Sequence, residues 1–188
     1  MKNKFILTAG LVLVMALNAQ SQTIVKCSTH EYTETVSKQD PQFVINQAEL
    51  EKETQAYLNG SKSFGNKSAV KIIPIVFHVF HNGGSENVSK ERILEQVAIL
   101  NKDFRRLNAD AILTQAEFVP VAADANIEFV LAKQDPNGLP TTGIVRKQGP
   151  KESYGPGDAT LLGQTSQWNP EEYLNMWVVP LVSPYLGF

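Results

Sequence analysis

The 188-residue sequence contains a single cysteine, Cys27, and three histidines, His30, His78 and His81. One cysteine excludes an internal disulfide. No run of lysine or arginine is present, and the formal net charge of -2 argues against a nucleic-acid partner. The chain also lacks any G-x-S-x-G or H-E-x-x-H sequence. It therefore shows neither the nucleophile elbow of a serine hydrolase nor a zinc-binding helix.

Two of the histidines stand close together, in the stretch HVFH at residues 78–81. A spacing of three on a strand directs the side chains to opposite faces, whereas a zinc-binding helix needs a spacing of four. We therefore expect structural roles for His78 and His81. No pair of carboxylates stands out, and no cysteine–histidine pattern indicates a thiol hydrolase. The residues alone predict no catalytic and no metal-binding residue in this chain.

The N-terminus has the character of a targeting segment. Lys2 and Lys4 precede a mostly apolar stretch at residues 5–17, and small or polar residues follow at 19–21. A helix over this stretch would reach about 20 Å, less than the roughly 30 Å of a bilayer core. We therefore predict a cleaved secretory signal peptide at residues 1–21, no stable membrane anchor, and export to the periplasm or outside the cell.

Residues 22–69 form a polar segment rich in Gln, Glu, Thr, Ser and Lys. Only residues 41–58 look helical, and residues 59–69 have the Gly/Ser/Asn composition of an exposed linker. A polar segment between a signal and a compact domain is typical of a pro-segment, although a disordered arm has the same composition. Cys27 lies in this segment. It is either an incidental or buried thiol, or a thiolate held for metal binding or regulation.

A change in composition at residue 70 marks the start of a compact domain that continues to residue 188. Residues 70–84 are a near-continuous run of β-branched and aromatic residues that ends in a Gly-Gly turn, which predicts a strand covered on both faces. Ser89 is a suitable N-cap for an amphipathic helix of about 18 residues. The apolar positions that repeat at helical spacing are Ile93, Val97, Leu100, Phe104 and Leu107.

The remaining residues predict further strands. Residues 126–148 indicate a strand, a turn and a second strand, and residues 149–169 look irregular. Residues 174–182 indicate another strand that is apolar on both faces. We therefore predict an α/β fold with a mostly parallel sheet. Asp135 and Asn137 in the turn have oxygen atoms of the kind that bind calcium. One such pair without further carboxylates does not support a calcium site, so none is predicted.

Four stretches in this order resemble the pappalysin family of zinc metallopeptidases, which belongs to the metzincin clan. They are IPIVFHVFHN (73–82), ILEQVAILNKDFRRLNAD (93–110), IEFVLAKQDPNGLPTTGIVR (127–146) and YLNMWVVPL (173–181). The resemblance implies that residues 70–188 form the upper half of a metzincin-like domain. In that half, a long helix backs a twisted mixed, mostly parallel sheet.

The resemblance also implies a function, namely a secreted zinc endopeptidase that is made as a proenzyme and acts on proteins or peptides. In the family, three histidines of an H-E-x-x-H-x-x-G-x-x-H helix hold zinc and the glutamate is the general base. This motif is absent, so no catalytic residue can be carried over. We expect a fragment truncated before the zinc helix and inactive by itself. The alternative is a secreted, non-enzymatic α/β binding module.

The family resemblance gives Cys27 a specific hypothesis. The pro-segment of a zinc peptidase can keep the enzyme latent when a cysteine thiolate takes the open position on the metal, because the thiolate displaces the attacking water. Cys27 is the only thiol in residues 22–69. It is therefore the candidate latency thiolate.

Overall fold

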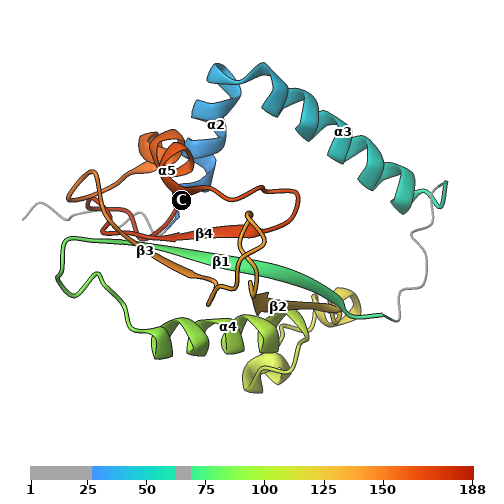
Figure 1. Ribbon diagram of the computed structural model, residues 1–188. Helices are drawn as coiled ribbons and strands as arrows, with labels where there is room; N and C mark the ends of the chain where they lie inside the picture. The colour runs from blue at the N-terminus through green and yellow to red at the C-terminus, as the bar shows by residue number, and fades with distance from the viewer. Residues whose placement is uncertain (1–26, 62–68) are drawn as a thin grey trace, which may run out of the picture.

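The computed structural model describes residues 27–61 and 69–188, and its centre is a parallel sheet (Figure 1). The long strand β1 (Lys71–His81) pairs with three short strands. These are β2 (Ile127–Leu131), β3 (Ile144–Gln148) and β4 (Leu174–Val178). All three ladders are parallel. The structure thus confirms the predicted α/β fold with a mostly parallel sheet.

The register of the ladders shows how β2, β3 and β4 can all pair with β1. β2 pairs with residues 71–75 of β1 and β3 with residues 77–81. The N–H of Lys71 donates toward β2 (Asn126 C=O) and the N–H of Phe77 toward β3 (Gly143 C=O), so odd-numbered residues bond to both strands and the two follow one another along the same edge. β4 pairs with residues 75–79. Because β3 and β4 both pair with residues 77–79, they must lie on opposite edges of β1. Strand β1 is therefore hydrogen-bonded on both sides at its centre.

Strand β1 is as deeply buried as its composition predicts. Residues 75–80 are all buried. In β1, the backbone groups of odd-numbered residues point to the edge that carries β2 and β3. The Lys71 N–H donates to the Asn126 C=O, and the Ile75 C=O accepts from the Ala132 N–H. Pro74 consequently faces the other edge, before the first residue that pairs with β4. Its missing N–H therefore removes no bond from the ladder.

Helix α4 (Lys90–Phe104) covers one face of the sheet. The Ser89 hydroxyl caps it by accepting a hydrogen bond from the Arg92 N–H at 3.3 Å, which confirms the predicted N-cap. Ile93 and Val97, one turn apart, are its buried residues. They pack in a core whose other buried members are Ile75, Phe77, Val79 and Phe129. The helix is slightly shorter than predicted.

The face of the sheet opposite α4 is covered by residues 149–169, whose predicted structure is wrong. The sequence predicts irregular structure for residues 149–169, but they contain the 3-10 turn η3 (Pro156–Asp158) and helix α5 (Ala159–Ser166). Leu162 of α5 packs with Phe80 and Tyr154 in a second core cluster. Burial of the Leu162 side chain stabilises a helix that its length and its internal glycine, Gly163, would not favour alone.

Strand β4 is shorter than the predicted strand 174–182, because it ends at Val178 and Pro180 follows. As expected, its side chains alternate between the two faces. Met176 and Val178 pack against the core under α4, and Trp177 packs with the cluster around Phe80. The predicted turn after β2 is present, and the Asp135 carboxylate accepts hydrogen bonds from the N–H groups of Asn137 and Leu139.

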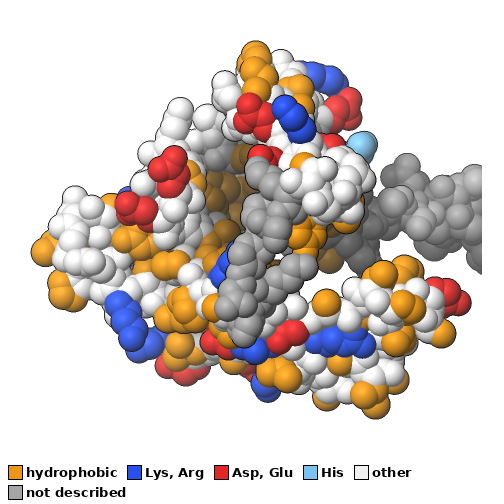
Figure 2. Space-filling view, turned by 90° about the vertical axis from the view of Figure 1, so that its right-hand side faces the viewer, with side chains coloured by type: hydrophobic (Ala, Val, Ile, Leu, Met, Phe, Trp, Pro, Cys, Tyr) orange, Lys and Arg blue, Asp and Glu red, His pale blue; other side chains and the backbone are white. Residues whose placement is uncertain are grey.

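The connection between α4 and β2 is a lobe with exposed apolar side chains. It contains the 3-10 turns η1 (Ala109–Leu113) and η2 (Val119–Val121). Figure 2 shows hydrophobic side chains spread over this lobe at the lower right. The large exposed residues are Leu107, Ile112, Leu113, Phe118, Val119 and Val121.

The N-terminal segment consists of two helices, α2 (Thr29–Gln39) and α3 (Pro41–Leu58). The prediction that residues 41–58 are helical is confirmed, with Asp40 capping the helix at Gln42. The prediction missed α2. Helix α3 has no buried residue and runs above the sheet, separate from it, in the view of Figure 1. The expected signal peptide (1–21) and most of the expected linker lie outside the described residues. No helix within 27–61 and 69–188 has the length and apolar character of a membrane span.

Candidate functional site

Cys27 is exposed and lies two residues before the first residue of α2. Its Sγ is 2.9 Å from the Thr29 hydroxyl. Hydrogen bonds from the Thr29 side chain and backbone lower the pKa of the Cys27 thiol. A lowered pKa increases the thiolate fraction near neutral pH, which is the form that reacts and that binds metals.

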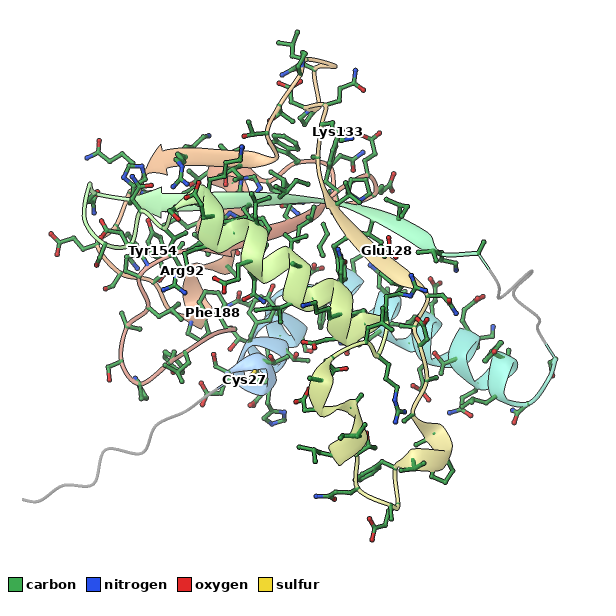
Figure 3. The ribbon with its side chains drawn as sticks, turned by 90° about the horizontal axis from the view of Figure 1, so that it is seen from below. Cys27, Arg92, Glu128, Lys133, Tyr154 and Phe188 are labelled. Atoms are coloured by element: carbon green, nitrogen blue, oxygen red, sulfur yellow. The ribbon has the colours of Figure 1, made fainter. Side chains whose placement is uncertain are left out.

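The residue after Cys27 anchors the start of α2 to the last residues of the chain. Ser28 is 1% exposed, and its N–H and hydroxyl both donate to the Gly187 carbonyl, at 3.1 and 2.9 Å. The Tyr185 hydroxyl donates to the Glu31 carboxylate at 3.1 Å, and this bond raises the pKa of Tyr185. Figure 3 shows Cys27 at the start of α2, on the side of the molecule where Phe188 lies. The anchor therefore fixes the position of the Cys27 backbone.

The three histidines do not come together at one site in the fold. His30 is exposed on α2, and His81, at the end of β1, accepts a hydrogen bond at Nδ1 from the Gly83 N–H. His78 is fully buried on the opposite face of β1 from His81, as the strand spacing predicts. Among the described residues, no group of three or more His, Cys, Asp or Glu side chains is placed to hold a metal ion.

His78 is the centre of a buried aromatic site that sequence reasoning missed. Its ring stacks on Trp177 at 5.2 Å between centroids and meets Trp168 edge-on at 6.2 Å. Its Nε2 is 2.9 Å from the Asn175 side-chain oxygen. Burial lowers the pKa of His78, the hydrogen bond to Asn175 acts in the opposite direction, and the Lys147 charge lowers it further. The available signal was that the two tryptophans of the chain lie within ten residues of each other.

Two hollows flank β4. One, of about 510 Å³, is lined by residues 72–74 of β1 and by residues 170–175. The other, of about 470 Å³, lies between Leu162, β4 and residues 186–188. The second hollow shares its wall with the anchor that holds Ser28, because Gly187 belongs to both. In the described part of the chain, the site thus combines a polarised thiol, a docked helix and an apolar hollow.

Comparison with known proteins gives matches among solved structures. No protein-family model and no curated protein matches the chain. A Tannerella forsythia promirolysin mutant is 35% identical with a TM-score of 0.62, and the match covers 81% of this chain and 50% of that one. Mirolysin in complex with compound 9 is 41% identical with a TM-score of 0.56, covering 61% and 44%.

Mature mirolysin of Tannerella forsythia, in complex with a cleaved peptide, gives a third match. It is 41% identical with a TM-score of 0.53, and the match covers 58% of this chain and 42% of that one. The chain thus spans half or less of the length of these proteins. It is similar in sequence and fold to part of mirolysin and promirolysin.

Proposed function

We propose that this chain is the N-terminal part of the precursor of a secreted zinc-dependent metalloendopeptidase of the pappalysin family. The likeness to promirolysin over 81% of the chain is the observation that carries the proposal. Mirolysin is a pappalysin-family metzincin, and one of its structures holds a cleaved peptide. Protein or peptide substrates are therefore proposed for the complete enzyme.

The extent of the matches supports a division of the chain into two parts. Promirolysin covers 81% of the chain, whereas the two mirolysin matches cover 61% and 58%. The difference is roughly a fifth of the chain, similar to the share of residues 27–61, and residues 70–188 make up roughly three fifths. We assign residues 22–69 to a pro-segment and residues 70–188 to the first part of the catalytic domain, with residues 1–21 as the export signal.

The residues of this chain do not fit a catalytic zinc ion. The sequence has no H-E-x-x-H, and its three histidines lie on an exposed helix, in a buried aromatic site and at a strand end. Zinc accepts nitrogen ligands at about 2.0–2.1 Å in a tetrahedral arrangement. Histidines this dispersed cannot meet at one ion while the sheet stays folded. The proposal therefore places the zinc ligands of the complete enzyme outside residues 1–188.

A metal and activity assay on two proteins tests the proposed function. Residues 22–188 alone are expected to bind no zinc after gel filtration and to leave casein intact. A protein extended by the codons that follow Phe188 is expected to bind one zinc per chain and to hydrolyse casein. The control is the extended protein with the first histidine of the H-E-x-x-H motif replaced by alanine. Chelator-sensitive proteolysis by residues 22–188 would contradict the proposal, and a gene without the motif in any downstream frame would favour a binding module.

The Cys27 thiol is proposed to keep the proenzyme latent. Cys27→Ala in the extended protein is expected to raise the activity measured before any cleavage of residues 22–69 by about tenfold or more, since each 1.4 kcal/mol of lost inhibitory binding is a factor of ten. Thr35→Ala, which removes an exposed hydroxyl of helix α2, is the matched control. A second measurement does not depend on activity. In the extended protein, the zinc-bound thiolate of Cys27 should react slowly with iodoacetamide, and chelation of the zinc should make the reaction fast. Unchanged latency in Cys27→Ala, or fast alkylation before chelation, would exclude this role.

A further inference from the structure

The buried ring of His78 has one nitrogen that is hydrogen-bonded and one that is not. Nε2 faces the Asn175 oxygen at 2.9 Å, whereas Nδ1 is buried without a hydrogen-bond partner among the described residues. A buried polar atom without a hydrogen-bond partner from the protein is uncommon and calls for an explanation. We propose that His78 is an acid-sensitive switch, which holds residues 167–173 on the sheet while its ring is neutral and releases them when the ring is protonated.

Asn175 connects the ring to that segment. Its oxygen accepts the Trp168 N–H at 2.8 Å, and its amide nitrogen donates to the carbonyls of Trp168 and Tyr173 at 2.9 and 3.2 Å. These three bonds fix which end of the amide faces His78. Because that end is the oxygen, the neutral ring must carry its hydrogen on Nε2 and donate it to Asn175. One side chain therefore links the strand β1, the strand β4 and the Trp168 backbone.

A second proton would go to Nδ1, where nothing stabilises it. The added N–H would point at no acceptor, and the ring would become a buried cation. Stacking on Trp177 offsets part of that cost, because aromatic faces attract cations, but it supplies no acceptor. The ring gains an acceptor only by reaching water, and in this arrangement the tryptophans at 168 and 177 must move to admit it.

The charged groups around the ring add no compensation. On β3, Lys147 has the same sign as the protonated ring and opposes protonation. Helix α5 carries no charged residue, and on β4 the neighbours are Asn175 and Trp177. In the segment itself, Glu171 and Glu172 are exposed, and the Tyr173 hydroxyl donates to the Gln134 carbonyl. Acidification therefore weakens the attachment of residues 167–173 to the sheet.

Release of this segment would change a hollow on the surface. Residues 170–175, Gln167 and Trp177 form one wall of the 510 Å³ hollow, and residues 72–74 form the other. Within the first wall, Gln167 and residues 170–173 belong to the segment that His78 and Asn175 hold in place. Protonation of His78 therefore opens this hollow, and neutral pH restores it. The inference does not depend on zinc or on the proposed peptidase activity.

Intrinsic fluorescence reports this switch directly, because both tryptophans of the chain contact the His78 ring. Residues 22–188 are titrated from pH 8 to pH 5. The emission is expected to shift to longer wavelength with a midpoint below the ordinary histidine pKa of about 6.5. Over the same range, the amide of Trp168 is expected to lose hydrogen-exchange protection by about tenfold or more after correction for the intrinsic rate, while the amides of α4 stay protected.

Three variants test whether His78 is the group whose protonation changes the fluorescence. His78→Gln keeps a donor for Asn175 but cannot be protonated, so its emission should not change with pH. His81→Gln, on the opposite face, should keep the transition of the parent. Lys147→Gln removes the nearby positive charge at an exposed position and should move the midpoint to higher pH, which also tests the switch if His78→Gln does not fold. A pH-independent parent, an unchanged midpoint in Lys147→Gln, or loss of α4 protection together with Trp168 would overturn the proposal.

Discussion

Replacing Phe77 with alanine is expected to lower the free energy of unfolding of residues 22–188 by about 3–5 kcal/mol, the usual cost of removing a buried aromatic ring. Phe77 is 2% exposed and lies at the centre of β1. It packs with Ile93 and Val97 of α4 in the core under the sheet. Truncation removes the contacts that join the helix to the central strand. Denaturation in guanidinium chloride, followed by circular dichroism, measures the loss.

The matched control for Phe77→Ala is Ile112→Ala. Ile112 is also a large apolar residue, but it is 88% exposed on the lobe between α4 and β2. Its truncation should change the free energy of unfolding by no more than about 0.5 kcal/mol, because surface positions away from special features tolerate substitution. Similar losses in the two variants would mean that the core does not lie between β1 and α4.

Replacing Gly143 with alanine is expected to cost about 2–5 kcal/mol. Gly143 is buried directly before β3, its φ is +71°, and its carbonyl accepts the Phe77 N–H. An added Cβ would lie 2.8 Å from the Ala132 nitrogen and 3.0 Å from the Leu131 Cβ. Backbone strain therefore adds to a clash with backbone that cannot rotate away. The free energy of unfolding and the midpoint of thermal unfolding both measure the effect.

Gly138→Ala separates strain from collision. Gly138 also has a left-handed conformation, with φ of +80°, but the nearest atom to its added Cβ is a side-chain nitrogen of Gln134 at 3.5 Å. This variant should lose only the cost of the left-handed backbone, about 1–2 kcal/mol. If both alanine variants lose the same stability, the close approach of β3 to residues 131–132 is not as described.

The elements that were predicted from sequence are those whose residues repeat with a clear period. The apolar run of β1 and the stripe of Ile93 and Val97 on α4 identify a buried strand and an amphipathic helix without tertiary information. Helix α5 gave no such signal, because it has eight residues, contains Gly163 and follows a glycine- and proline-rich turn. Helix α2 contains several β-branched residues and no buried residue. Contacts with distant parts of the chain stabilise both.

The candidate site also contains residues that the sequence identifies and contacts that it does not predict. Cys27 could be singled out because it is the only thiol, but Ser28 meets Gly187 across 159 positions of sequence. His78 could be placed on a strand face, but its partner Asn175 is 97 positions away. The His78–Asn175 pair depends on which residues of β1 and β4 are in register. No local pattern encodes that register, since any apolar strand would satisfy the same periodicity.

Because β2, β3 and β4 all pair with β1, the sheet cannot be completed until long after β1 has been synthesised. About 90 residues separate β1 from β4, which correspond to about 5–20 s of synthesis at typical rates. During that interval, the edge of β1 that β4 later covers presents free backbone N–H and C=O groups beside strongly apolar side chains. Such an edge pairs readily with other chains. Slow translation between residues 82 and 173 is therefore expected to lower the yield of soluble protein, and a chaperone that shields this edge on the ribosome-bound chain is expected to raise it.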